Sequence, residues 1–104
     1  MSNNEKILAI DIDGTICSIN ENYSKCSLLP GVHSSFKLFR EKGYKIYLHT
    51  GRHINNFDVT INWLKKNKID YDHIVFGKPV AKYYIDDRGI NFTNWKDAIK
   101  KMKL

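Results

Sequence analysis

The stretch that decides the fold is KILAIDIDGT, residues 6–15. Its first half, residues 6–10, is a nearly continuous apolar run, which is typical of a central strand buried on both faces of a parallel sheet. The run ends at Asp11 and Asp13, and the turn-forming Gly14 follows them. Because ligand sites of open α/β sheets lie beyond the carboxyl ends of the strands, this stretch predicts a strand and a site together.

Outward from this stretch, strand and helix patterns alternate along the chain. The expected elements are helices over residues 32–42, 56–67 and 95–103 and strands over residues 44–50, 73–76 and 83–85. Asn94 is the expected N-cap of the last helix. The alternation favours an α/β fold, built as a single Rossmann-like domain over residues 1–104. We expect a parallel sheet with strand order 3-2-1-4, right-handed crossovers and helices on both faces, which gives three layers.

Polar residues follow each of the expected strands. They are Asp11 and Asp13 after the first strand, Thr50-Gly51 after the second, Lys78 shortly after the third, and Asp86-Asp87 after the fourth. Carboxylates gathered at one edge of a sheet repel each other and need a cation. Oxygen ligands without a cluster of histidines or cysteines favour Mg²⁺, which also bridges to phosphate oxygens.

In this order and at these spacings, the residues resemble the four-motif signature of the haloacid-dehalogenase superfamily. The match runs from DIDGT, residues 11–15, through Thr50 and Lys78 to Asp86-Asp87. The resemblance implies a Mg²⁺-dependent phosphatase, a phosphoric monoester hydrolase that acts through an aspartyl-phosphate intermediate. The segments TGR and YYIDDR, together with the short chain, are similar to small phosphatases of capsule and surface-polysaccharide biosynthesis.

The resemblance also implies a role for each motif. Asp11 would attack phosphorus as the nucleophile, and Asp13 would protonate the leaving oxygen and then act as a base towards water. Thr50 and the amides around Gly51 would hold the phosphoryl group, while Lys78 would offset the carboxylate charge and contact the phosphate.

The resemblance also implies which residues would bind the metal and the substrate. The Mg²⁺ ligands would be Asp11, the backbone carbonyl of Asp13, and Asp86, with Asp87 acting through water or as a further ligand. Arg52 leaves two interpretations open, a clamp for a second anionic group of the substrate or a structural ion pair. His49 precedes Thr50 on a buried strand, and we expect a core histidine with its hydrogen bonds satisfied.

Most members of the superfamily close the site with an inserted cap domain. The two intervals that could hold one, residues 16–29 and residues 77–82, provide a flap at most. Substrate selection is therefore expected from the flap, from Arg52 and its neighbours, or from a second subunit that covers the site in a homo-oligomer.

The composition limits which binding partners and which cellular compartment we expect. The net charge of +6 suits a small anionic phosphate ester, and the lysines are spread along the chain or placed near helix ends, which argues against nucleic-acid binding. No apolar run approaches the roughly 20 residues of a membrane helix, and no signal-peptide pattern is present. We expect a cytoplasmic protein in which Cys17 and Cys26 are reduced thiols.

Several other functions compete with a metabolite phosphatase. A receiver-like phosphoacceptor module would need adjacent acids at the first strand and an acceptor aspartate on a middle strand. A polynucleotide-end phosphatase or a protein phosphatase of the same fold would keep the chemistry and change the substrate. A phosphomutase would need a cap, and a dehalogenase or a pump-type ATPase would lack the second aspartate, Asp13.

Overall fold

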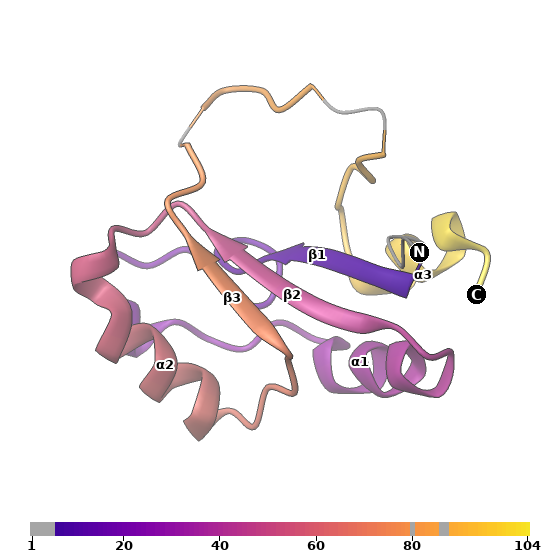
Figure 1. Ribbon diagram of the computed structural model, residues 1–104, viewed down its shortest axis with the longest axis horizontal. Coiled ribbons are helices and arrows are strands. Elements are labelled where there is room, and N and C mark those ends of the chain that lie inside the picture. Colours follow the sequence, from indigo (N-terminus) through magenta and orange to yellow (C-terminus); the bar gives the residue numbers. More distant parts are fainter. Residues whose placement is uncertain (1–5, 80, 86–87) are drawn as a thin grey trace.

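The computed structural model describes residues 6–79, 81–85 and 88–104. Six helices and strands form the framework, and two single-turn 3₁₀ helices join them (Figure 1). In chain order they are β1 (Ile7–Asp11), η2 (Tyr23–Lys25), α1 (Val32–Glu41), β2 (Lys45–Thr50), η3 (Ile54–Asn56), α2 (Phe57–Lys66), β3 (His73–Phe76) and α3 (Trp95–Met102). The three predicted helices and the first three predicted strands are present, with ends that differ by one residue at most.

The three strands form one parallel sheet in the order β1-β2-β3. In its register Asp11 lies opposite His49, and Thr50 lies opposite Phe76. The carboxyl ends of all three strands therefore meet at one edge of the sheet. This edge is where the sequence analysis placed the site.

The prediction of a fourth strand over residues 83–85 is wrong, because this segment has no regular secondary structure. Tyr83, Tyr84 and Ile85 are 74%, 54% and 100% exposed, so the core does not cover them. The chain after β3 instead arches away from the sheet before it returns to α3 (Figure 1). The four-strand order 3-2-1-4 is not formed in the described residues, and Asp86 and Asp87 lie outside them.

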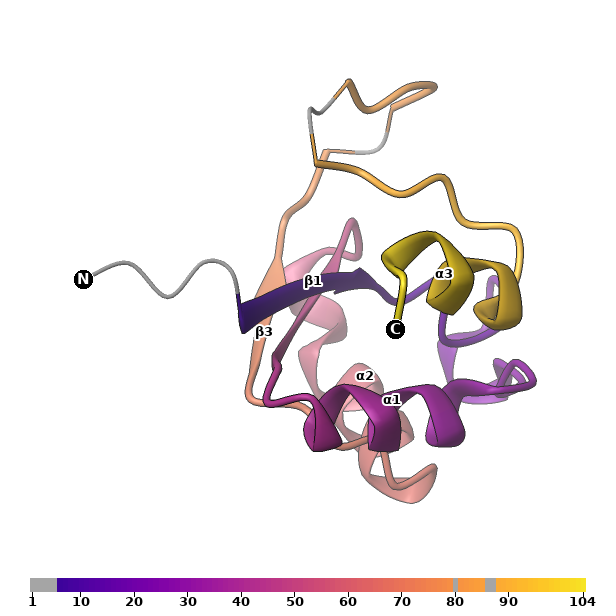
Figure 2. The same cartoon turned by 90° about the vertical axis from the view of Figure 1, so that its right-hand side faces the viewer.

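The core lies between one face of the sheet and the helices. Ile46, Leu48 and Thr50 alternate along β2 and are fully buried, since α1 and α2 lie on that side of the sheet (Figures 1 and 2). On the opposite face Ala9 and Val75 are exposed. The described residues thus show two layers rather than the predicted three, because β1 is covered on one face only.

Helix α3 anchors the loop that follows β1. Trp95 packs against α1, with ring centroids 5.8 Å from Phe36 and 5.9 Å from Phe39. Its indole Nε1 donates a hydrogen bond to the carbonyl of Thr15 at 2.9 Å. At the start of α3, the side chain of Asn94 accepts a hydrogen bond from the amide of Asp97, which confirms the predicted N-cap.

Gly31 makes the close contact between α1 and α3 possible. Its φ of +87° lies in the left-handed region, and a Cβ atom there would lie 3.2 Å from Cβ of Trp95. A side chain at this position would therefore strain the backbone and push α3 away.

The two ends of the predicted flap, residues 16–29, are hydrogen-bonded to each other. The amide of Leu29 donates to the carbonyl of Ile16 at 2.9 Å, and the amide of Ser18 donates to the carbonyl of Ser27 at 2.8 Å. Ile16 and Cys17 are fully buried at its base. None of the helices in the described residues has both the length and the apolarity needed to cross a membrane.

Candidate functional site

Asp11 ends β1 and faces its register partner on β2. Its Oδ1 lies 3.7 Å from Nδ1 of His49. Burial raises the pKa of Asp11, the positive charges of Lys78 and His49 act in the opposite direction, and the carboxylate of Asp13 adds to the increase. Asp11 is therefore a partly desolvated carboxylate whose charged form depends on nearby cations.

His49 is a site residue that the sequence analysis assigned to the core. Its Nδ1 is buried and has no hydrogen-bond partner in the described residues. Burial lowers the pKa of His49, Lys78 acts in the same direction, and Asp11 opposes them. The signal was available in the sequence, because residues opposite each other in a parallel ladder share a face, but it required the register to be known.

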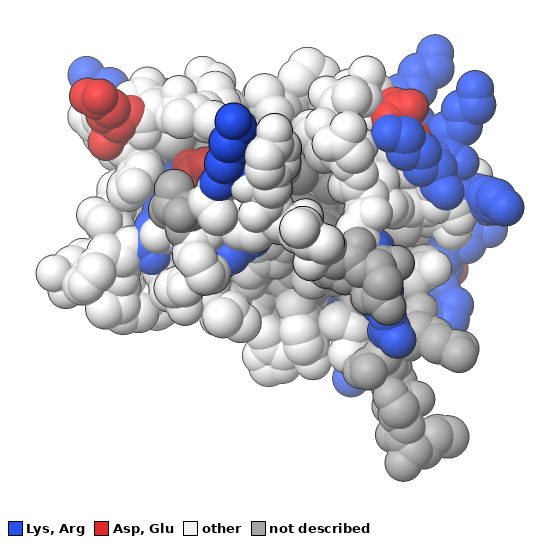
Figure 3. Space-filling model, turned by 90° about the horizontal axis from the view of Figure 1, so that it is seen from above, with Lys and Arg blue, Asp and Glu red and all other residues white. Residues whose placement is uncertain are grey.

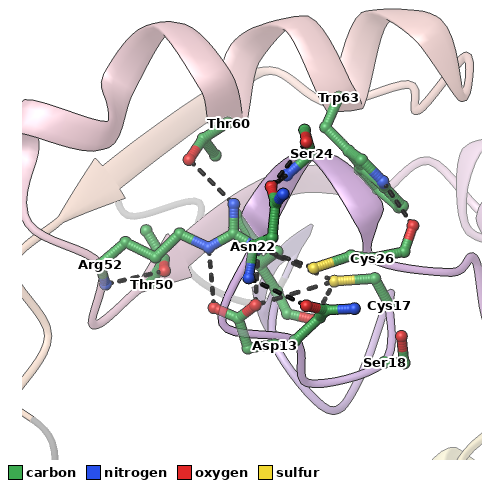
Figure 4. Close-up of polar contacts among 12 residues, drawn as sticks. Asp13, Cys17, Ser18, Asn22, Ser24, Cys26, Thr50, Arg52, Thr60 and Trp63 are labelled. Carbon is green, nitrogen blue, oxygen red and sulfur yellow. Dashed lines mark hydrogen bonds and ion pairs between the residues drawn. The ribbon is translucent and has the colours of Figure 1, made fainter.

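Asp13 is held by Arg52 through a two-pronged ion pair (Figure 4). Nη2 of Arg52 donates to Oδ1 at 2.6 Å, and Nε donates to Oδ2 at 2.9 Å. Guanidinium and carboxylate planes match in this arrangement, which gives strong, directional hydrogen bonds. Because a carboxylate has about four lone-pair positions, Asp13 can accept further hydrogen bonds.

Arg52 is itself buried and surrounded on all sides. Its side chain is 2% exposed, and Nη1 donates to Oγ1 of Thr60 on α2 at 3.0 Å. The ring of Tyr23 stacks on the guanidinium, with its centroid 3.8 Å from Cζ. The hydrogen bonds with Asp13 raise the pKa of Arg52 although burial alone would lower it. Of the two interpretations of Arg52, the structure contains the ion pair.

Two thiols complete the surroundings of this ion pair. Nη2 of Arg52 lies 3.6 Å from Sγ of Cys26 and 4.0 Å from Sγ of Cys17 (Figure 4). Burial raises the pKa of the Cys17 thiol, and Cys26 and Asp13 add to the increase. This group could not be predicted from the sequence, because Asp13, the two thiols, Arg52 and Thr60 come from separate parts of the chain.

Thr50 lies at the end of β2 and organises the two loops beside it. Its Oγ1 accepts a hydrogen bond from the amide of Arg52 at 3.0 Å. Its carbonyl accepts from the amides of Gly77 at 3.1 Å and Lys78 at 3.0 Å. Gly51, between Thr50 and Arg52, is exposed. The backbone of Lys78 is thus fixed to the strand end, and its Nζ lies 4.0 Å from the ring centroid of Tyr84.

One group in the described residues has the composition and spacing of a metal site. The ligand atoms of Asp13, Cys17 and Cys26 all lie within 4.8 Å of one another. The predicted oxygen site is different, since it joins Asp11 and Asp13 to Asp86 and Asp87, which lie outside the described residues. Asp11, Asp13, Thr50 and Lys78 are the predicted residues that the structure brings to one edge of the sheet.

An open hollow lies beside the flap. It has a volume of about 640 Å³. Its lining residues are Glu21, Asn22, Tyr23, Asn56 and Val59. Tyr23 also stacks on Arg52, but Asp11, Asp13 and Thr50 are not among the residues that line the hollow.

Comparison with known proteins shows which fold this chain has, but it does not show a family. No protein-family profile matches the chain, and no curated protein matches it. A solved structure from Vibrio cholerae is 26% identical with a TM-score of 0.71, and the match covers 82% of each chain. A conserved protein from Bacteroides thetaiotaomicron, 21% identical with a TM-score of 0.62 over 94% of this chain and 91% of that one, shares the fold.

A chain of the Pnkp1/Rnl/Hen1 complex is also similar. It is 26% identical with a TM-score of 0.62, and the match covers 83% of this chain. The match covers 32% of that chain, so the similarity concerns one part of a larger protein. Together these likenesses establish a small α/β fold that occurs both alone and within a larger chain.

Proposed function

We propose that the protein is a phosphoric monoester hydrolase that acts through an aspartyl-phosphate on Asp11. One observation carries the proposal. Asp11 ends β1 and Asp13 follows it, at the same sheet edge as Thr50 at the end of the adjacent β2, and the backbone amide of Lys78 donates to the carbonyl of Thr50. Two carboxylates and an ammonium group at one edge are groups that phosphoryl transfer uses, and the buried Thr50 fixes the backbone of the loops beside them.

The chemistry divides between the two aspartates. An oxygen of Asp11 forms a bond to phosphorus while the bond from phosphorus to the ester oxygen breaks, and Asp13 gives that oxygen a proton. A water molecule then attacks the phosphorus of the aspartyl-phosphate, and Asp13 takes its proton. Inorganic phosphate leaves and Asp11 is restored. Arg52 keeps the carboxylate of Asp13 in one orientation through both steps.

The residues present fit a magnesium ion. Burial and the charge of Asp13 both raise the pKa of Asp11, so a cation beside this carboxylate would stabilise its nucleophilic form. The carboxylate of Asp11 and the carbonyl of Asp13 would hold the ion, together with Asp86 and Asp87. When bound, Mg²⁺ neutralises charge on the phosphoryl oxygens. We expect excess chelator to abolish hydrolysis of an aryl phosphate and added Mg²⁺ to restore it.

The proposed substrate is a small phosphorylated metabolite, such as a sugar phosphate of surface-polysaccharide biosynthesis. The support is the motif resemblance of residues 50–52 and 83–88, together with a short flap that leaves the site open. A second subunit of a homo-oligomer is the alternative cover for the site.

A polynucleotide end is the second candidate substrate. It is favoured by the likeness to a chain of the Pnkp1/Rnl/Hen1 complex, which is an RNA repair complex. The net charge of +6 suits it, although the basic side chains gather at one end of the face seen in Figure 3. A screen that compares sugar phosphates with phosphate-terminated oligonucleotides, read by released phosphate, separates the two candidates.

The mechanism is tested by replacing each aspartate in turn. Asp11→Asn removes the nucleophile, and kcat should fall by about 10⁴-fold or more. Asp13→Asn should lower kcat by about 10²- to 10⁴-fold and release a burst of phenol from an aryl phosphate, because this leaving group scarcely needs protonation. The phosphate should then remain on Asp11, where intact mass spectrometry detects it.

The matched control is Asp58→Asn, which changes an exposed aspartate in the first turn of α2 and should leave kcat unchanged. Retention of activity in Asp11→Asn would reject the covalent mechanism. Loss of both burst and labelling in Asp13→Asn, with activity kept in Asp11→Asn, would reverse the two roles.

A further inference from the structure

The exposed side of α3 carries a row of lysines. Lys96, Lys100 and Lys103 are exposed, and their side chains make no hydrogen bond or ion pair in the described residues. Residues three or four positions apart are neighbours on a helix surface, so Lys100 lies between the other two. Figures 1 and 3 show that basic side chains gather at the end of the molecule that holds α3. The row therefore presents three positive charges to solvent.

The acidic residue of α3 does not neutralise this row. Oδ2 of Asp97 lies 2.9 Å from Nζ of Lys101 and accepts a hydrogen bond from Oγ1 of Thr93 at 2.9 Å. Nζ of Lys101 also donates to the carbonyl of Asn91 at 3.0 Å. Asp97 and Lys101 thus hold each other and the segment before the helix. The other lysines of α3 are left without an acidic partner on the helix.

Helix stability does not explain the whole row. Cations are favourable in the last turn of a helix and unfavourable in the first turn, where Lys96 lies. Lys96 and Lys100 are also like charges four residues apart, and such pairs destabilise a helix. The sequence analysis related the lysines to helix ends, and Lys96 lies outside that explanation. A bound polyanion would replace the repulsion within the row by attraction.

The row begins beside the candidate site. The indole Nε1 of Trp95, the first residue of α3, donates to the carbonyl of Thr15 at 2.9 Å. Thr15 belongs to the loop that carries Asp13. Because a helix rises about 1.5 Å per residue, Lys103 lies roughly 10 Å further along α3 than Lys96. A linear polyanion that follows the row therefore has one end beside the loop of Asp13.

These features favour a nucleic-acid strand over a lipid surface. A helix that lies on a membrane buries an apolar face in the lipid. The apolar residues of α3 already belong to the core of the protein or pack against it, and they are Trp95, Ala98, Ile99 and Met102. A nucleic-acid backbone needs no apolar face, because lysine contacts with its phosphates are enough for binding that is independent of sequence.

We propose that α3 is a docking surface for the phosphate backbone of a single-stranded nucleic acid, with Lys96, Lys100 and Lys103 as its contacts. Contacts with phosphates carry no sequence information, so binding is independent of the bases. The strand places its terminal phosphate at Asp11. This second half rests on the proposed function, and it favours the polynucleotide end of the two candidate substrates. It departs from the sequence expectation, which took the lysines along the chain and not by surface.

The salt dependence of binding tests the surface, on the full chain and with a fluorescent oligothymidylate that has no terminal phosphate. For a single strand, each phosphate contact contributes about −0.7 to the slope of log K against log salt concentration. The α3 variant combines Lys96→Gln, Lys100→Gln and Lys103→Gln. Its slope should be less steep than that of the wild type by about 2, and its binding at low salt should be at least about tenfold weaker. An unchanged slope would overturn the proposal.

The matched control places the same charge change on another helix. Lys65, Lys66 and Lys68 are exposed at the end of α2, which lies at the opposite end of the molecule from α3 (Figure 1). Changing all three to glutamine gives the same net charge as the α3 variant and should keep the wild-type slope. Exposed substitutions of this kind rarely affect folding. Equal losses in both variants would show that net charge alone acts, and would overturn the docking surface.

Two further probes test the nature of the partner. Oligouridylate should bind like oligothymidylate, because both contain the same phosphodiester backbone. A preference of tenfold or more, roughly the effect of one specific base contact, would overturn docking through the backbone alone. Vesicles rich in phosphatidylserine should bind more weakly than either oligonucleotide. Binding of the wild-type protein to these vesicles and to neither oligonucleotide would overturn the choice of nucleic acid.

Activity measurements separate this proposal from the proposed function. The α3 variant should raise KM for a phosphate-terminated oligonucleotide at least tenfold more than KM for an aryl phosphate. An equal change in the two KM values would reject delivery of the strand end to Asp11. Binding through α3 in a protein without phosphatase activity would uphold the docking surface and reject the proposed function. Hydrolysis of the aryl phosphate by a protein that binds neither oligonucleotide would reject the docking surface and leave the proposed function standing.

Discussion

The molecule contains two arginine–aspartate clusters with similar hydrogen bonds and different surroundings. Arg52 donates two hydrogen bonds to Asp13, at 2.6 Å and 2.9 Å, inside the protein. Arg40, near the end of α1, lies on the surface. It donates hydrogen bonds to Asp70 at 2.8 Å and 3.0 Å and to Asp72 at 2.6 Å. The side chain of Arg52 is 2% exposed, whereas that of Arg40 is 28% exposed.

The two clusters differ in whether water can replace an aspartate that the arginine has lost. If Asp70 is lost, solvent can still reach the guanidinium of Arg40. If Asp13 is lost, Arg52 still contacts Thr60, two thiols and the Tyr23 ring inside the protein. Removing one partner of a buried ion pair leaves an uncompensated charge, which costs far more than breaking an exposed pair. The buried cluster therefore fixes a site residue in place, and the exposed one joins surface elements.

The largest effect is expected for Arg52→Met, which leaves Asp13 without its partner. The free energy of unfolding should fall by about 3 kcal/mol, measured by denaturant titration. If Arg52 only positions Asp13, kcat should fall with little change in KM, and a clamp on the substrate would instead raise KM.

Arg52→Lys is the matched variant, since it keeps the charge but loses the two-pronged geometry. We expect a stability between those of the wild type and Arg52→Met. A loss below about 1 kcal/mol in Arg52→Met, the range of exposed pairs, would remove the distinction between the two clusters.

A smaller effect is expected for Arg40→Met. The free energy of unfolding should fall by about 1 kcal/mol at low salt, and less at about 1 M salt, where charges are screened within about 3 Å. Because Arg40 contacts no residue of the candidate site, kcat should not change. A loss as large as that of Arg52→Met would show that exposure does not set the difference.

The smallest effect concerns pH and Asp72. The hydrogen bond from Arg40 lowers the pKa of Asp72 below its ordinary 3.8, and the bond from the amide of Ile46 adds to this. A carboxyl group whose pKa is lower in the folded state stabilises the fold above its unfolded pKa, and this contribution is lost as the pH falls through the folded pKa.

Asp72→Asn should remove this acid-sensitive contribution to the free energy of unfolding. Between about pH 5 and about pH 2, the wild-type protein should lose about 0.5–1 kcal/mol more than the variant, a range that allows for solvent contact of both side chains. Denaturant midpoints measured across this range provide the test. Parallel pH curves for the two proteins would show that the bond with Arg40 contributes nothing measurable.

Much of the site could be predicted because its residues stand next to strand ends. The apolar run before Asp11 and the β-branched and aromatic run before Thr50 fix two strands, and parallel pairing then brings both ends to one edge. The same reasoning failed at residues 83–85. A run of aromatic and aliphatic residues has strand propensity, but a strand also needs a ladder partner, and Tyr84 and Ile85 contact none.

The residues around Asp13 could not be predicted, for a different physical reason. Arg52 had two interpretations, and the sequence analysis described Cys17 and Cys26 only as reduced thiols. Their meeting depends on how the flap packs on α2, where the indole Nε1 of Trp63 donates to the carbonyl of Cys26 at 2.8 Å. No periodic pattern encodes such contacts between irregular segments.

By itself, the sequence determined the strands that place Asp11, Asp13 and Thr50, because hydrophobic periodicity and turn residues act over a few neighbouring positions. The tertiary structure alone decided that Arg52 faces Asp13, that Cys17 and Cys26 share a pocket with them, and that His49 faces Asp11. It also decided that the helices cover one face of the sheet in the described residues. Such features depend on packing between distant segments, where burial and charge pairing, not local propensity, set the lowest free energy.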